Sequence, residues 1–143
     1  MINTDIAAKF AENETPFYYY DLNVLNKTLE AAHVASHKRG FHVHYALKAN
    51  FNDQLLKAIQ SVGFGADCVS GNEVKKAIEC GFDSRKVTFA GVGKSDKEIN
   101  YALDQNIFAF NVESIQELEV INELASKKGV KANVALRINP NVD

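Results

Sequence analysis

The sequence predicts an α/β fold built from repeated strand–helix units. Short runs rich in β-branched and aromatic residues recur with centres roughly 21–25 residues apart, and the segments between them carry apolar residues at helical spacing. The five predicted strands are 41–47, 64–69, 86–90, 107–112 and 130–138. Strands that alternate with helices pair in parallel through right-handed crossovers, so we expect one parallel sheet with helices packed on it.

The predicted helices have recognisable boundaries. Three Ser-x-x-Glu tetrads precede helices and are predicted capping boxes, in which the serine oxygen and the glutamate carboxylate accept hydrogen bonds from unpaired N–H groups; they begin at Ser70, Ser95 and Ser114. These helices are expected to end at residues that tolerate a left-handed backbone, namely Gly81, Asn106 and Gly129. Two earlier helices are expected at about 21–40 and 52–63 from the same apolar spacing.

Two architectures share this alternation: a doubly wound open sheet and a closed (β/α) barrel. A dinucleotide-binding open sheet has a glycine-rich turn after its first strand, whereas this sequence has Leu47-Lys48-Ala49-Asn50-Phe51-Asn52 there. The barrel is therefore favoured. A complete barrel needs eight strands and about 250 residues. We expect residues 1–143 to form only the N-terminal portion of a TIM-type (β/α)8 barrel domain, roughly its first five strands.

Composition argues against several classes of function. The chain has 16 basic and 18 acidic residues, a formal net charge of −2, whereas sequence-independent nucleic-acid binders carry a basic excess. No apolar run approaches the roughly 18 residues of a membrane span, and Met1–Phe10 lacks the regions of a secretory signal. Cys68 and Cys80 form no CxxC pair, so neither a disulfide framework nor a zinc site is indicated. We expect a cytoplasmic protein without nucleic-acid, membrane or metal partners.

Alternation along the first strand assigns one set of residues to the face that lines the barrel. The residues of this parity are His42, His44, Ala46 and Lys48. Lys48 is the last of them, so it is expected at the carboxyl end of the strand, where barrel enzymes keep their chemistry. His44 is interpreted as a packing or water-bonded group.

Later strands place polar residues at the same height. Asp67, Asn111 and Arg137 have the interior parity, so we expect a lysine, an aspartate and an arginine to converge on one mouth. Leu136 has the opposite parity and is expected in the helix-facing layer. A lysine held near a cation in a partly dry pocket can form an imine with an aldehyde. The plain alternative is a solvated lysine at a strand end and an aspartate that caps a helix.

Two further patterns have chemical interpretations. The stretch Ala90-Gly91-Val92-Gly93-Lys94-Ser95 resembles a phosphate-binding loop, but Thr88 stands where that motif needs its first glycine, so a nucleotide hydrolase is a minor alternative. Two histidine pairs share a face without a third ligand nearby, which favours packing or solvation over a metal site: His33 with His37, and His42 with His44.

At Tyr45-Ala46-Leu47-Lys48-Ala49-Asn50 the sequence resembles the barrel domain of the fold-type III pyridoxal-phosphate decarboxylases. The resemblance begins at Thr15–Asp21, which is similar to the family's opening strand, and runs to the chain end. It includes Gly65–Glu73, Phe89–Gly91 with Lys94 and Glu98, Asn111–Ser114 and Leu136–Pro140. Within the family the sequence is most similar to the branch that acts on diaminopimelate. The branch that acts on ornithine, arginine or carboxynorspermidine is the alternative.

This resemblance implies an alanine-racemase-like barrel that binds pyridoxal 5′-phosphate, with Lys48 holding the cofactor as an imine. Four other residues match positions of the family's cofactor pocket: Ala46, Asp67, Glu73 and Arg137. The implied reaction converts meso-diaminopimelate to L-lysine and carbon dioxide, the last step of lysine biosynthesis, in a cytoplasmic homodimer.

The same resemblance places essential parts of the site outside this chain. The family's phosphate-binding loop, the acidic partner of the pyridine nitrogen and a C-terminal β domain would all follow residue 143, so these residues alone are expected to be inactive. A barrel that carries the cofactor or binds a partner protein without turnover remains an alternative, because it would share the same pattern.

Overall fold

The computed structural model describes residues 4–140, and the short stretches 1–3 and 141–143 of the predicted barrel portion lie outside the described residues. From α3 onward, helices and strands alternate. The elements are α1 Thr4–Ala11, α2 Leu22–His37, β1 His44–Ala46, α3 Asp53–Ser61, β2 Gly65–Cys68, α4 Gly71–Glu79, β3 Val87–Phe89, α5 Asp96–Asp104, β4 Ala109–Val112, α6 Ile115–Lys128 and β5 Val134–Leu136, with 3-10 turns at Leu47–Ala49 and Ser84–Lys86.

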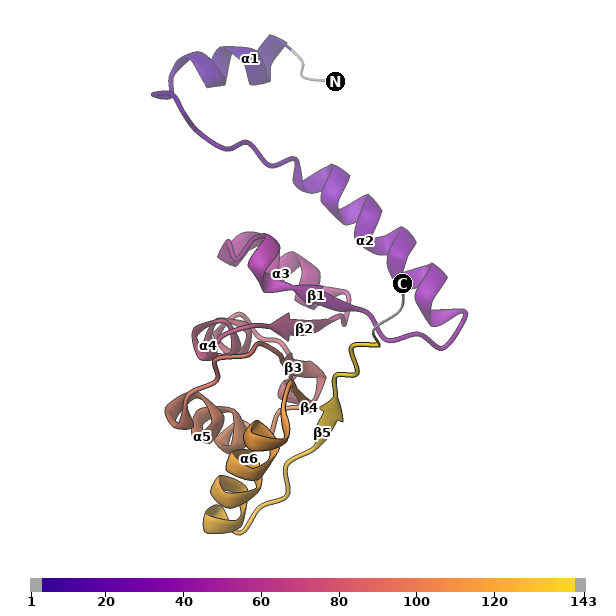
Figure 1. Cartoon of the computed structure of the whole chain (residues 1–143). Coiled ribbons are helices and arrows are strands. Elements are labelled where there is room, and N and C mark those ends of the chain that lie inside the picture. Colours follow the sequence, from indigo (N-terminus) through magenta and orange to yellow (C-terminus); the bar gives the residue numbers. More distant parts are fainter. Residues whose placement is uncertain (1–3, 141–143) are drawn as a thin grey trace.

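The five strands form one parallel sheet in the order β1-β2-β3-β4-β5. Each strand therefore lies beside the next strand in sequence, with no reversal of the kind that defines a doubly wound sheet. Figure 1 shows α4, α5 and α6 side by side on one side of this sheet. This is the arrangement of a barrel wall, and the predicted (β/α) succession is confirmed.

All five predicted strands are present but shorter than expected. The first strand shows why: its pairing with β2 ends at the register pair Ala46 and Asp67, and the chain then enters the 3-10 turn Leu47–Ala49. Lys48 consequently lies just beyond the strand rather than as its last residue. Its position at the carboxyl end of the sheet is as predicted.

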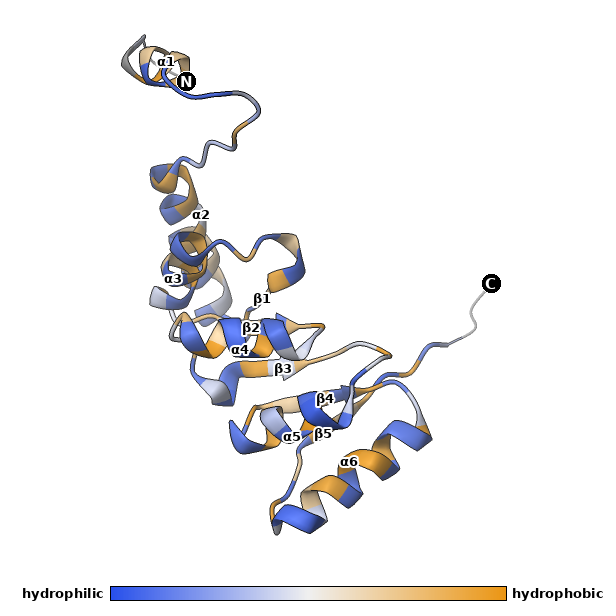
Figure 2. Cartoon of the chain, turned by 90° about the vertical axis from the view of Figure 1, so that its left-hand side faces the viewer, coloured by the Kyte–Doolittle hydropathy of each residue, from blue (hydrophilic) through white to orange (hydrophobic). Residues whose placement is uncertain are grey.

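The core lies between the sheet and the helices on it. Its largest fully buried side chains come from both layers and include Phe89, Phe110, Leu47, Leu56, Ile99, Ile121, Val74 and Val87. In Figure 2 the helices on the sheet carry both hydrophobic and hydrophilic residues, whereas β3 is hydrophobic or neutral along its length. This is the pattern of a strand buried between layers and of helices with one solvent face.

The predicted helix starts are confirmed for their serines and partly corrected for their glutamates. Each serine accepts a hydrogen bond from the third helical N–H. Only Ser95 completes the capping box, because Glu98 Oε2 accepts from its N–H at 3.0 Å. Glu73 and Glu117 reach one residue further back instead. Their N-cap serines have φ of −151° and −153°, against −81° at Ser95, so the more extended backbone presents the preceding N–H group.

The predicted helix ends are confirmed. Gly81, Asn106 and Gly129 all have positive φ, at +93°, +50° and +67°. No helix within residues 4–140 is long and apolar enough to cross a membrane.

The N-terminal segment differs from the expectation. Residues 15–21, expected to resemble a strand, form none, and Phe17 to Tyr20 are exposed. A strand needs a neighbour to pair with, and both views show the backbone of α1 and of this segment apart from the strands (Figures 1 and 2), although the Tyr20 side chain reaches Asn50 in the turn after β1. Helix α1 itself has no counterpart among the predicted elements.

The fifth strand also differs. Leu136, expected in the helix-facing layer, is 62% exposed, because no helix within the described residues covers the outer face of β5. The sheet has β1 and β5 as its two edges.

Candidate cofactor site

A cavity of about 400 Å³ opens at the carboxyl edge of the sheet. Every strand contributes to its wall, either by its last residues or by the loop that follows. The lining residues are Lys48, Asp67, Val69, Ala90, Gly91, Asn111, Glu113, Ala135, Leu136 and Arg137. The predicted convergence of Lys48, Asp67 and Arg137 on one mouth is therefore confirmed as geometry, and Asn111 joins them.

The primary amine of Lys48 is held at this mouth by a well-braced turn. The side chain is exposed and has no hydrogen-bond partner among the described residues. Just after it, the Tyr45 hydroxyl donates to the carbonyl of Asn50 at 3.1 Å, and Asn50 Nδ2 donates to the Tyr20 hydroxyl at 2.8 Å. Burial, followed by the neighbouring Tyr20, raises the pKa of Tyr45, so its hydroxyl keeps the proton it donates. These hydrogen bonds fix the turn after β1, while the side-chain amine of Lys48 stays accessible from the cavity.

Asp67 lies on β2, beside Lys48's strand. It is half-buried, and its Oδ1 accepts a hydrogen bond at 3.1 Å from the hydroxyl of Thr88, its register partner on β3. The next residue, Cys68, is fully buried, and burial together with the nearby carboxylates of Glu73 and Asp67 raises the pKa of its thiol. Asp67 is consequently the ionisable side chain that β2 presents to the cavity.

Arg137 and Glu113 form an ion pair on the opposite wall. Arg137 Nη1 lies 3.0 Å from Glu113 Oε1, with side-chain exposures of 63% and 12%. Glu113 is not among the site residues predicted from the sequence, although it stands two residues after Asn111, where strand alternation returns to the same face. That parity is the signal that could have identified it.

Two of the predicted site residues do not line the cavity. Ala46 lies within β1, opposite Asp67 in the register. The Glu73 carboxylate accepts a hydrogen bond from the N–H of Val69 at 2.8 Å, so it fixes a lining residue from behind. For both residues, direct contact with a cofactor stays a prediction.

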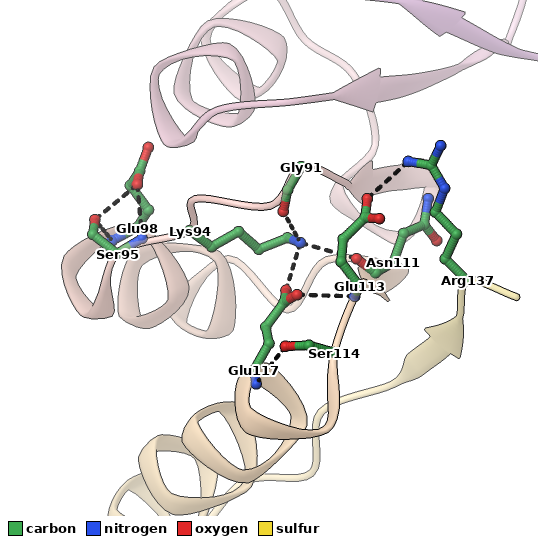
Figure 3. Close-up of polar contacts among 9 residues, drawn as sticks. All are labelled: Gly91, Lys94, Ser95, Glu98, Asn111, Glu113, Ser114, Glu117 and Arg137. Carbon is green, nitrogen blue, oxygen red and sulfur yellow. Dashed lines mark hydrogen bonds and ion pairs between the residues drawn. The ribbon is translucent and has the colours of Figure 1, made fainter. Parts of the chain in front are cut away.

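The glycine-rich stretch before α5 is not built as a phosphate loop. The side chain of Lys94 is 1% exposed, and its ammonium donates hydrogen bonds to three acceptors of the protein, drawn in Figure 3. All three donors of a lysine are thereby used, which leaves none for a phosphate.

The histidines lie at the other end of the sheet. All four line a second cavity of about 550 Å³ at the amino ends of the strands, together with Phe41, Phe64 and Phe108. His44 Nδ1 is buried there without a partner, and within the described residues no group of three or more potential ligands could hold a metal ion. His33, His37 and His42 are exposed, so solvation is the interpretation of these three, whereas the half-buried His44 is interpreted as a packing group.

The sequence and the fold match one family over most of the chain. Residues 23–143 match the family model for the pyridoxal-binding domain of pyridoxal-dependent decarboxylases. The chain belongs to this family, and its parallel sheet is the five-stranded part of an alanine-racemase-like barrel.

The individual relatives are more specific. The diaminopimelate decarboxylase of Bacteroides thetaiotaomicron is 56% identical over 136 residues, which is 94% of this chain and 35% of the relative. The crystal structure of diaminopimelate decarboxylase from Helicobacter pylori complexed with L-lysine has a TM-score of 0.83 and 39% identity, covering 96% of this chain and 35% of that one. The structure of the arginine decarboxylase of Paramecium bursaria Chlorella virus has a TM-score of 0.69 and 28% identity, covering 82% of this chain and 31% of that one. The chain thus spans about a third of the length of the relatives it matches.

Proposed function

We propose that residues 1–143 are the N-terminal portion of the pyridoxal-phosphate-binding barrel domain of a decarboxylase, with Lys48 as the residue that binds the cofactor covalently. The observation that carries the proposal is the placement of Lys48. Its free amine shares one cavity with a carboxylate, Asp67, and a guanidinium, Arg137. The family match over residues 23–143 supports the same role.

The side chains present fit pyridoxal phosphate. An aldehyde requires an accessible primary amine, which Lys48 supplies, and a cavity of about 400 Å³ lies in the range of small-molecule sites. Asp67 and Arg137 would lie along the walls as charged groups for the polar edges of the cofactor. When bound, pyridoxal phosphate supplies an electron sink that accepts the pair left behind by carbon dioxide.

The remaining roles belong to the protein's own groups. Lys48 would hold the cofactor covalently through its side-chain amine, and as a primary amine it could also carry a proton. Asp67 keeps its orientation through Thr88, and Arg137 keeps its own through Glu113. Glu73 fixes the backbone at Val69. Preorganised charges of this kind are what a protein contributes to cofactor chemistry.

We further propose meso-diaminopimelate as the substrate and L-lysine with carbon dioxide as the products. Support comes from the relatives: curated proteins named diaminopimelate decarboxylase are 37–56% identical to this chain, whereas an arginine and an ornithine decarboxylase of known structure are 28% and 27% identical to it. A cytoplasmic homodimer in which further segments complete the site is part of the same proposal. Residues 1–143 alone are expected to release no carbon dioxide.

The test is a decarboxylation assay on the whole protein that carries this domain, with meso-diaminopimelate, ornithine and arginine offered separately. Carbon dioxide from diaminopimelate alone is the expected result. Release from ornithine or arginine instead would place the protein in the polyamine branch, and bound cofactor without any release would favour a carrier. Lys48→Ala should abolish release. Lys57→Ala, which removes an exposed lysine of α3, should retain it.

A further inference from the structure

A buried ion pair lies directly behind the cavity wall. Lys94 Nζ is 2.5 Å from Glu117 Oε1, and the two side chains are 1% and 12% exposed. The same ammonium donates to the carbonyls of Gly91 at 2.7 Å and Asn111 at 2.9 Å, and it lies 5.4 Å from the centre of the Phe89 ring. One side chain therefore joins the end of β3, the end of β4 and the start of α6 (Figure 3).

Two of these three acceptors belong to residues that line the cavity. Gly91 and Asn111 both contribute to its wall, whereas Lys94 and Glu117 do not. Gly91 has φ of +105°, and a Cβ there would lie 3.0 Å from the carbonyl oxygen of Val69, another lining residue. The loop after β3 thus passes tightly between β2 and the ammonium, with little freedom to move.

The pair also connects to Arg137. The second oxygen of Glu117 accepts a hydrogen bond from the N–H of Glu113 at 2.9 Å, and the Glu113 carboxylate accepts from Arg137 at 3.0 Å. A continuous series of polar contacts therefore runs from the buried ammonium to the guanidinium in the cavity, as drawn in Figure 3. Residues that hold the side chains of a site in place must themselves be rigidly held, and buried charge-assisted hydrogen bonds provide that rigidity.

We infer that Lys94, through its pair with Glu117, is a positioning residue of the cofactor site: it fixes the backbone of Gly91 and Asn111 and, through Glu113, the place of Arg137. The inference rests on the proposed function for the identity of the ligand. In this role Lys94, whose sequence context resembles a phosphate loop, positions the cavity wall without touching substrate or cofactor.

The test compares three variants of the whole protein. Lys94→Met removes the ammonium and leaves the Glu117 carboxylate buried without its partner, which destabilises a fold strongly. The double variant Lys94→Met/Glu117→Met leaves no buried charge, so it regains stability but still lacks the connection. The matched control is Lys128→Met, because Lys128 also joins α6 to a neighbouring element through an ion pair, with Asp104 at 2.6 Å, but lies away from the cavity.

Two quantities are measured: the dissociation constant of pyridoxal phosphate, and hydrogen exchange at the N–H groups of Ala90 and Arg137. These two amides donate to the carbonyls of Cys68 and Val112, at 2.8 Å and 2.9 Å, and not to the ion pair. The exchange rates of these two amides therefore show whether the strand ends keep their positions, and they can be measured in the cofactor-free protein. In the double variant we expect cofactor affinity at least tenfold weaker and exchange at both amides at least tenfold faster, while Lys128→Met changes neither.

The outcomes separate the two proposals. If the double variant regains stability, affinity and slow exchange together, the pair is only structural and the inference is wrong. If the unaltered protein fails to bind pyridoxal phosphate at Lys48, the proposed function is wrong. Amide exchange at Ala90 and Arg137 then still decides whether the pair positions the strand ends.

Discussion

Glu98 accepts a hydrogen bond from the backbone N–H of Gly71, 27 residues earlier in the chain, at 2.7 Å. The other carboxylate oxygen accepts from the N–H and the hydroxyl of Ser95, at 3.0 Å and 2.7 Å. A Cβ on Gly71 would collide with the Glu98 side chain, so this close approach requires glycine. The first turn of α5 is in this way fastened to the first turn of α4, beside the loops that bear the site.

This contact predicts a pH-dependent stability. Hydrogen bonds from the N–H of Ser95, the N–H of Gly71 and the Ser95 hydroxyl lower the pKa of the Glu98 carboxyl in the folded chain. The resulting stabilisation is present above about pH 4.3, the ordinary pKa of glutamate, and is lost as the pH falls through the lower pKa of the folded state. Glu98→Gln should therefore lower the free energy of unfolding by about 1 kcal/mol at pH 7, with a smaller difference at acid pH.

Denaturant unfolding at several pH values measures this effect. Glu79→Gln is the control, because that carboxylate is 57% exposed and lies 3.8 Å from Lys75; it should change the free energy of unfolding by less than about 0.5 kcal/mol. A Glu98→Gln difference that stays constant down to low pH would contradict the assignment of the stabilisation to the ionised carboxylate.

Gly65 at the start of β2 is expected to tolerate no side chain. A Cβ there would collide with the carbonyl oxygen of Lys86 and would lie 2.7 Å from His44 Nδ1. Because the nearest obstacle is backbone, which cannot rotate away as a side chain can, Gly65→Ala should destabilise the fold by about 1–3 kcal/mol. Gly93→Ala is the matched control: a Cβ there meets nothing within 4 Å, and the cost should stay within about 0.5 kcal/mol. Equal melting temperatures for the two variants would refute this packing argument.

Two apolar truncations should differ sharply. Phe89 on β3 is fully buried, so Phe89→Ala should cost about 3–5 kcal/mol. Leu136 on β5 is 62% exposed, so Leu136→Ala in the 143-residue chain should cost less than about 0.5 kcal/mol. Chemical denaturation of both variants provides the comparison. A large cost at Leu136 would mean that the outer face of β5 is covered after all.

Lys48→Ala should separate function from folding. The side chain is exposed and has no partner among the described residues, so its loss should change the free energy of unfolding by less than about 0.5 kcal/mol. Thermal unfolding of the cofactor-free protein measures this. A loss of stability comparable to that of Phe89→Ala would instead make Lys48 a structural residue.

Much of this fold could be predicted because short sequence patterns determine where its helices begin and end and which face of a strand each residue occupies. The serine caps and the left-handed residues Gly81 and Asn106 act within a few positions of themselves, so they mark helix ends without knowledge of the rest of the chain. Strand parity likewise placed Lys48 and Arg137 at one mouth, because alternation along a strand and parallel pairing are general rules.

What could not be predicted depends on contacts between distant segments. The burial of Lys94 requires β4 and α6 to lie beside its loop, and the pairing of Glu113 with Arg137 spans 24 residues. The exposure of Leu136 depends on the absence of a covering helix within the described residues, which strand parity does not reveal. Glu73 has the sequence of a capping box, yet its carboxylate fixes the N–H of Val69, since backbone dihedral angles decide which donor lies within reach.

Covalent binding of pyridoxal phosphate by Lys48 is tested most directly by borohydride reduction of the protein mixed with the cofactor, followed by peptide mass mapping. Reduction fixes an imine as a stable amine on the lysine that formed it. We expect an adduct concentrated on Lys48, with exposed lysines such as Lys57 labelled weakly and Lys94, whose side chain is buried, unlabelled. Labelling scattered over exposed lysines in the whole protein, with Lys48 unmodified, would contradict this expectation.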